Sequence, residues 1–160
     1  MNLRKISSIL SLFLLITITM SAQSNSSMNA VALRLKPGED LKKTLEAYVK
    51  DHQVKAACII TCCGSLTQAA IRYADKPNTD TIVGKFEILS VTGTLSENGS
   101  HLHLSIADGK GNTIGGHLKE GSLIYTTAEI VIGILPDLEF ERETDSTYGF
   151  KELKVVKLKK

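Results

Sequence analysis

Only one segment of this 160-residue chain has the apolar spacing of a helix, and most of the chain after it alternates as strands do. Between Glu39 and about His52, apolar side chains recur every three or four residues, which places them on one stripe of a helix. The stripe consists of Leu41, Leu45, Tyr48, Val49 and His52. We interpret His52 as a packing residue or a partner of the helix C-terminal dipole rather than a functional group. The pattern predicts one helix in a mainly stranded domain.

The expected strands fill most of the remaining chain. They are 30–36, 54–63, 66–73, 84–95, 102–107, 113–118, 125–135 and 152–158. The almost continuous apolar run at 54–63 is typical of a central strand covered on both faces, and we expect Gly64-Ser65 to interrupt it. Glu97-Asn98-Gly99 contains an Asn-Gly turn signal. One helix with about eight strands predicts an α+β fold, a single compact domain whose mixed or antiparallel sheet curls around the helix.

The first 22 residues have the layout of a secretory signal peptide. Arg4 and Lys5 precede an uncharged, mostly apolar run of 15 residues, and Ser21-Ala22 follows it. The run is shorter than the roughly 20 apolar residues of a membrane span, although a retained anchor is the alternative. We expect a signal peptide at 1–22, a polar linker at 23–29 and the domain at 30–160. The protein is then exported, to the periplasm, with no transmembrane segment in the mature chain.

The charge balance argues against a nucleic-acid partner. The chain has 19 Lys and Arg against 17 Asp and Glu, and 1–22 holds two of the basic residues and no acid, so the rest is neutral. A neutral domain has no bulk attraction for a phosphate backbone. Five lysines nevertheless crowd the C-terminus, where we expect a solvated edge strand and tail, with an anion-binding patch as the alternative. They are Lys151, Lys154, Lys157, Lys159 and Lys160.

The three cysteines are poorly spaced for a disulfide. Cys62 and Cys63 would point to opposite faces of a strand, and Cys58 lies about 13 Å from Cys62 along it. We expect buried free thiols that act as small apolar side chains.

Three histidines are placed to converge across a hairpin. His101 and His103 share one face of a strand, and the glycine-rich segment 109–111 reads as the turn that follows. If the loop is Gly109 to Gly111, Asp108 pairs with Asn112 and His103 faces His117, so that all three rings lie on one face. A loop with an even number of residues would turn His117 to the other face.

Three neutral imidazoles on a rigid face suit zinc, or iron or nickel, with a fourth coordination position open. An open position would permit anion binding or water activation, so a metal-dependent hydrolase or lyase is one alternative. A hydrogen-bonded polar layer or a subunit contact fits the same pattern. No Ser-His-Asp or Cys-His nucleophile can be assembled, and the sequence does not otherwise indicate an enzyme or assign catalytic residues.

A second polar group centres on Glu129, a charge inside an apolar strand that needs a partner. Arg142 or Arg72 could supply it. We consider a structural ion pair and, alternatively, a ligand-facing acid.

Several ordered blocks resemble the PPC domain, the plants and prokaryotes conserved domain, over about residues 30–156. They are Gly64-Ser65-Leu66, Arg72-Tyr73-Ala74, the segment 84–89, Gly93-Thr94-Leu95, the segments 101–105, 115–118 and 128–131, and Phe140-Glu141-Arg142-Glu143. The resemblance implies an α+β fold that assembles as a homotrimer. It also implies that 84–89 matches a plant segment that engages partner transcription factors. The candidate ligand or partner contacts are Gly84, Lys85, Phe86, Glu87, Glu129 and Arg142.

In plants this domain accompanies AT-hooks, the modules that read DNA, and no AT-hook sequence occurs in this chain. The family's DNA-binding role is therefore an alternative rather than our main expectation. We expect an exported homotrimeric binding module that holds a metal ion or small ligand through His101, His103 and His117.

Overall fold

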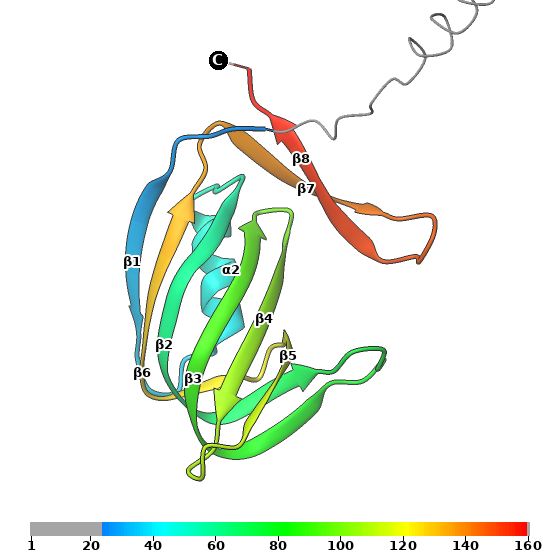
Figure 1. Ribbon diagram of the computed structural model, residues 1–160. Coiled ribbons are helices and arrows are strands. Elements are labelled where there is room, and N and C mark those ends of the chain that lie inside the picture. The colour runs from blue at the N-terminus through cyan, green and yellow to red at the C-terminus, as the bar shows by residue number, and fades with distance from the viewer. Residues whose placement is uncertain (1–23, 160) are drawn as a thin grey trace, which may run out of the picture.

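The expected helix lies against one face of a curled antiparallel sheet (Figure 1). The computed structural model describes residues 24–159. Its elements are β1 (Asn29–Leu35), α2 (Leu41–Asp51), β2 (Ala57–Arg72), β3 (Asp80–Ser96), β4 (Gly99–Ala107), β5 (Thr113–Leu118), β6 (Leu123–Ile134), β7 (Leu138–Thr144) and β8 (Lys151–Lys157). The domain is mostly sheet with one short helix, so the α+β description is looser than the sequence suggested.

Helix α2 forms as its apolar stripe predicts. Asp40 caps its N-terminus by accepting a hydrogen bond from the Lys43 amide at 3.0 Å. The stripe residues Leu41 and Leu45 are fully buried against the sheet. His52 ends the helix, with its ring stacked on Tyr48 at 4.3 Å between centroids. The ring of His52 is exposed, and its Nδ1 also lies 2.9 Å from the Tyr48 carbonyl oxygen, so the side chain contacts the end of its own helix.

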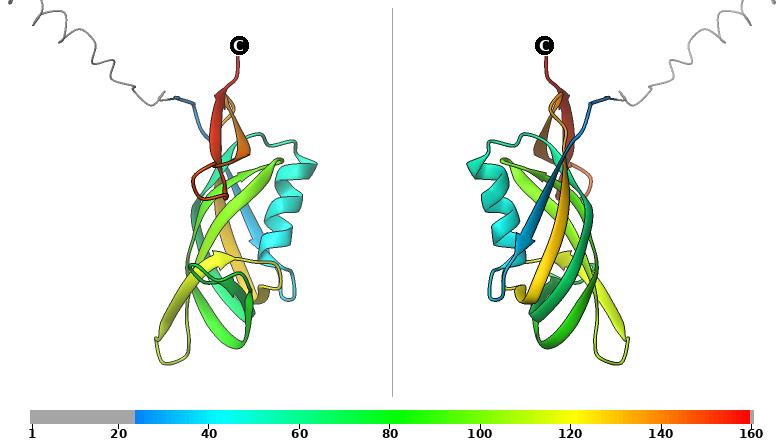
Figure 2. Two further views of the ribbon diagram at one scale, coloured as in Figure 1. Left: turned by 90° about the vertical axis from the view of Figure 1, so that its right-hand side faces the viewer. Right: turned by 90° about the vertical axis from the view of Figure 1, so that its left-hand side faces the viewer.

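The main sheet has six strands in the order β1-β6-β2-β3-β4-β5, and every pairing in it is antiparallel. The sheet curls far enough for β5 to pair also with the end of β2, where Arg72 lies opposite His117. Figure 2 shows the curl and the helix on one side of it. The curl brings together residues that are 45 positions apart in sequence.

The strand boundary expected at Gly64-Ser65 is wrong, because β2 runs through it without a break. Gly64 has a φ of +148°, and a Cβ there would lie 2.1 Å from the carbonyl oxygen of Thr127 on β6. The glycine therefore allows a close backbone approach within a long irregular strand and does not end one.

Strand β7 was not predicted, and it pairs with β8 in a separate two-stranded sheet. Leu138 and Phe140 bury one face of this hairpin against Ala56. The carbonyl oxygen of Phe140 accepts hydrogen bonds from the side chains of Ser96 (3.1 Å) and Asn98 (3.2 Å). The β7–β8 hairpin is thereby attached to the turn between β3 and β4.

All three cysteines are free, as expected, but they differ in exposure. Cys62 is buried, and burial raises the pKa of its thiol to about 12. Cys58 is half-buried and Cys63 is exposed, so the expectation of buried thiols holds only for Cys62.

The predicted signal peptide lies outside the described residues. Within 24–159, no helix combines the length and the apolar character needed to cross a membrane.

Candidate metal centre and adjoining pocket

The β4–β5 hairpin has the register that brings the three histidines together. The loop is Gly109 to Gly111, since the Asp108 amide donates to the Asn112 carbonyl at 3.0 Å, and His103 lies opposite His117. One ligand nitrogen from each of the three imidazoles lies within 4.8 Å of the others. The predicted convergence is confirmed, and a loop of different parity would have removed it.

Asp108 determines the shape of the loop. Its carboxylate accepts hydrogen bonds from the amides of Lys110 (2.8 Å) and Asn112 (2.9 Å) and from the Asn112 side chain. These hydrogen bonds lower the pKa of Asp108, led by the one from the Asn112 side chain. Gly111 supplies the left-handed conformation, at φ +82°, that the loop requires. The local sequence thus builds an odd-numbered loop and sets the face of His117.

The imidazoles of His101 and His117 pack closely, and their surroundings favour the neutral form of both rings. Their rings stack with centroids 5.2 Å apart, and the Nε2 atoms of His101 and His103 are 3.2 Å apart. Burial first, and then nearby cations led by Arg72, lower the pKa of His117 to about 4. Burial and then His103 and Arg142 lower the pKa of His101, despite the opposing effect of Glu152. Neutral imidazole is the form that binds metals.

The donor set fits a divalent transition metal. Three imidazole nitrogens with no carboxylate or thiolate in the group match a three-histidine zinc site, which leaves a fourth position for water or another ligand. All three residues lie on one hairpin of two paired antiparallel strands. Iron and nickel sites also accept imidazole, so the donors alone do not select one metal.

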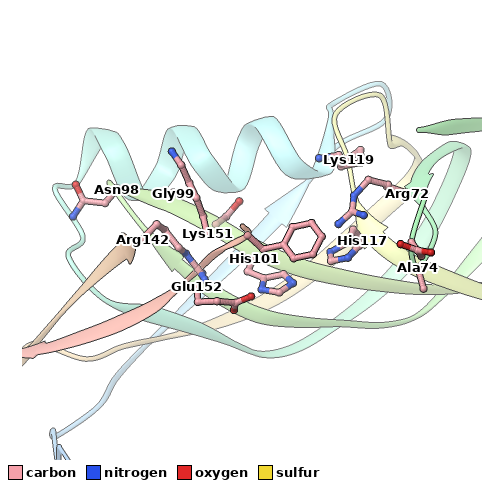
Figure 3. A pocket seen from close by; sticks show the side chains of 13 residues that line it. Arg72, Ala74, Asn98, Gly99, His101, His117, Lys119, Arg142, Lys151 and Glu152 are labelled. Carbon is pink, nitrogen blue, oxygen red and sulfur yellow. The ribbon is translucent and has the colours of Figure 1, made fainter. Parts of the chain in front are cut away.

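A pocket of about 670 Å³ adjoins the histidines, between the curled sheet and the β7–β8 hairpin (Figure 3). His101 and His117 form part of its wall. The other lining residues are Arg72, Ala74, Asp75, Asn98, Gly99, Ser100, Lys119, Arg142, Phe150, Lys151 and Glu152. In Figure 3 the Arg72 guanidinium lies beside His117, while Arg142 and Glu152 lie beside His101.

Arg142 belongs to this pocket and not to an ion pair with Glu129. Its Nη2 donates to Thr94 Oγ1 at 2.7 Å, and its Nε is buried without a hydrogen-bond partner. Burial lowers the pKa of Arg142, and Glu152 opposes that effect. Glu129 is exposed on β6, and neither arginine that we considered forms an ion pair with it in the described structure. The predicted ion pair is wrong, because the side chain points to the outer face of the sheet.

The candidate contact segment 84–87 divides between two faces of β3. Lys85 and Glu87 are exposed, and the Lys85 ammonium lies 4.6 Å from the centre of the Tyr125 ring. Phe86 is 9% exposed and belongs to the core, so it is not available for partner contact in this chain. Gly84 packs against the Phe86 ring, where a Cβ would lie 2.9 Å from the ring edge. None of these residues lines the pocket beside the histidines.

Sequence reasoning missed the side of the pocket that comes from the β7–β8 hairpin. Phe150, Lys151 and Glu152 lie where β8 begins, and the sequence pattern places the lysine only in the C-terminal cluster. Lys119 directly follows β5, the strand that carries His117. This closeness in sequence was the one signal that could have identified Lys119 as a pocket residue. Arg72 stands out in the sequence as a partner for Glu129, whereas the structure sets it beside the histidines.

Comparison with known proteins identifies the family. The family model of the Plants and Prokaryotes Conserved (PCC) domain, the same domain that is also abbreviated PPC, matches residues 22–136. The chain therefore belongs to this family, as the ordered blocks predicted.

Some relatives are much longer than this chain, and one solved structure is of similar length. It is 43% identical, over 81% of its length, to the bifunctional protein GlmU of a Synechococcus strain, and it spans about a fifth of that protein. It is 31% identical to AT-hook motif nuclear-localized protein 10 of Arabidopsis thaliana, over 65% of this chain and 32% of that one. A solved structure of a hypothetical protein from Salmonella superposes with a TM-score of 0.83 and 41% identity, covering 85% of this chain and 99% of that chain.

Proposed function

We propose that this protein is an exported, homotrimeric binding module that holds a divalent transition metal, zinc foremost, through His101, His103 and His117. The observation that carries the proposal is the convergence of one nitrogen from each imidazole within 4.8 Å. The lowered pKa values of His101 and His117 support it, since a protonated imidazole cannot bind a metal. A bound ion would retain one open position for a ligand from the pocket.

The homotrimer is supported by the outer face of the sheet and by what the family resemblance implies. This face leaves large apolar side chains in solvent, among them Val83 (78% exposed), Leu89 (53%) and Ile60 (47%). Lys85 and Glu87 lie between Val83 and Leu89 on the same exposed face of β3. An apolar patch with charges beside it is typical of a protein–protein contact, and a second and third copy of the chain would cover it. Analytical ultracentrifugation tests this part, because a monomer at micromolar concentration would contradict it.

Metal analysis tests the central proposal. Purified protein from residue 23 onward, loaded with zinc and desalted, should retain about one ion per chain when the three donors are intact. The triple variant with His101, His103 and His117 changed to Ala should retain none. The chain has four histidines, and His52, which ends α2, is not part of the three-histidine group, so His52→Ala is a matched control that should retain the ion. Equal metal content in the triple variant and the control would contradict the proposal.

The export part of the proposal is tested separately. N-terminal sequencing of the protein recovered from its native cell should begin close to Gln23, because the targeting pattern ends at Ala22. A chain that begins at Met1 in the soluble fraction would contradict export.

DNA binding is the alternative that the plant relative suggests, since its name refers to an AT-hook. The C-terminal lysines offer little support, because Lys154 already forms ion pairs with Glu141, at 3.0 Å, and with Glu143. A DNA-binding role requires affinity that falls steeply with salt on a log–log plot. A flat or absent response would leave the binding module as the better description.

A further inference from the structure

Charge balance at the histidine cluster calls for an additional anion. A divalent ion on three neutral imidazoles would bring two positive charges into a site already flanked by Arg72 and Arg142 (Figure 3). The acids that line the same pocket are Asp75 and Glu152, against four cations. Like charges at close range are costly unless a counter-charge lies between them.

The cations of the pocket keep hydrogen-bonding capacity free for such a group. Within residues 24–159, no carboxylate lies within 4 Å of the charged nitrogens of Arg72, Lys119, Arg142 or Lys151. Arg72 donates one bond, from Nη1 to the Lys76 carbonyl at 3.3 Å. Arg142 lines the pocket and donates one recorded bond, from Nη2 to Thr94 Oγ1, and its buried Nε has no acceptor. Guanidinium groups bind planar oxyanions through paired N–H donors, so two arginines with free donors suit an anionic group.

The size and lining of the pocket indicate a small molecule and not a polymer. A volume of about 670 Å³ is in the range of pockets for organic ligands. Phe150 lines the pocket and is 61% exposed as a residue, so it provides an apolar surface next to the cations. A nucleic-acid backbone would instead be expected to follow an extended basic stripe.

We propose that this pocket binds a small organic oxyanion, a phosphate ester or carboxylate with an apolar group, whose anionic head lies between Arg72 and Arg142 beside the histidines and whose apolar part packs on Phe150. The proposal rests on the proposed function for one contact, the open position of the metal. The arginine and phenylalanine contacts do not depend on the metal.

Calorimetric titration with defined probes tests the proposal. The probes are inorganic phosphate, phenyl phosphate and benzoate, each added to zinc-loaded protein and to protein stripped with a chelator. We expect phenyl phosphate or benzoate to bind, and the preferred one identifies the head group. Arg72→Gln and Arg142→Gln should each weaken binding about tenfold or more, because each removes charge-assisted hydrogen bonds. Phe150→Ala should weaken phenyl phosphate while leaving inorganic phosphate unchanged.

The matched control is Arg34→Gln. Arg34 is an arginine on β1 that bonds Thr127 and does not line the pocket, so this change should leave binding unaltered. Arg142 donates a hydrogen bond to Thr94, so thermal unfolding is needed to show that Arg142→Gln still folds. Arg72 donates only to the exposed Lys76 carbonyl, so Arg72→Gln tests the proposal without that concern.

The outcomes separate the two proposals. Zinc retention without probe binding, or with binding equally strong in Arg72→Gln and Arg34→Gln, would overturn the oxyanion pocket and leave the metal site intact. Probe binding that depends on Arg72 in a protein that retains no zinc would support the pocket and contradict the metal site. Binding of double-stranded DNA in competition with phenyl phosphate, and tighter than it, would assign the pocket to a phosphate backbone and overturn the small-molecule proposal.

Discussion

Gly93 should be among the positions least tolerant of a methyl group in this domain. It lies on β3 opposite Leu102 of β4, with a φ of +133°. A Cβ at this position would lie 1.9 Å from the carbonyl oxygen of His101 and 2.9 Å from its carbonyl carbon. Both contacts are with backbone, so no side-chain rotation can relieve them. Gly93→Ala therefore forces either β3 or β4 to move.

The magnitude has two contributions. A non-glycine residue in this backbone region costs about 1–3 kcal/mol, and overpacking against neighbouring atoms costs about 1–3 kcal/mol more. The free energy of unfolding should fall by about 2–6 kcal/mol, a large part of the roughly 5–15 kcal/mol of an ordinary domain. Urea unfolding of the metal-free protein, followed by circular dichroism, measures this change. Because the clash falls on the backbone of His101, zinc affinity should fall as well.

Gly109→Ala is the control, since Gly109 lies in the β4–β5 loop without a positive φ, and a Cβ there would meet nothing within 4 Å. Its change should remain within about 0.5 kcal/mol. If Gly93→Ala cost less than about 1 kcal/mol, or no more than the control, the close approach of β3 and β4 and the reasoning built on it would be refuted.

Three further predictions concern the helix, a buried hydroxyl and pH. Leu45→Ala should lower the unfolding free energy by about 2–5 kcal/mol, because this side chain of α2 is fully buried. Lys50→Ala, on the exposed side of the same helix, should change the unfolding free energy little. Equal effects of the two substitutions in urea unfolding would contradict this packing. Ser122→Ala should cost about 1–3 kcal/mol in the same assay, since the buried Ser122 hydroxyl accepts from the Ala70 amide at 3.0 Å, and no loss would contradict that bond's role. In the metal-free protein, the stability that neutral His117 contributes should be fully present above about pH 6.5 and be lost as the pH falls toward 4. The reason is that unfolded His117 takes up a proton in this range, whereas folded His117, with a pKa of about 4, does not. Thermal unfolding of His117→Gln at a series of pH values should show a shallower loss, and an unchanged slope would exclude His117 as the group responsible.

The histidine site could be predicted because it depends on local geometry. His101 and His103 are two residues apart on one strand, and the loop length alone decides whether His117 joins them. Asp108, Gly109 and Gly111, which lie within four consecutive residues, determine that length. The same holds for α2, whose apolar stripe and Asp40 cap lie within one short segment.

The pocket could not be predicted because it depends on contacts between distant segments. The pairing of β5 with the end of β2, which sets Arg72 beside His117, follows from the curl of the whole sheet. In β7, charged residues lie on both sides of Phe140 in the sequence. This pattern indicates a solvated segment unless the partner strand is known. Glu129 was misjudged because the apolar strand β6 is covered on one face only, with the glutamate on the other.

The attachment of the β7–β8 hairpin has a consequence for the pocket, because part of the pocket wall comes from a separate small sheet. The histidines lie within residues 22–136, which the family model matches, whereas Arg142, Phe150 and Glu152 lie after that match, within or beside a hairpin with its own small sheet. Substitutions, insertions or a different tail there would change the shape and charge of one pocket wall without disturbing the β4–β5 hairpin. In our proposals the metal would lie within that matched region, and part of the wall that would contact the bound molecule lies outside it, so ion binding and ligand selectivity would depend on different parts of the chain.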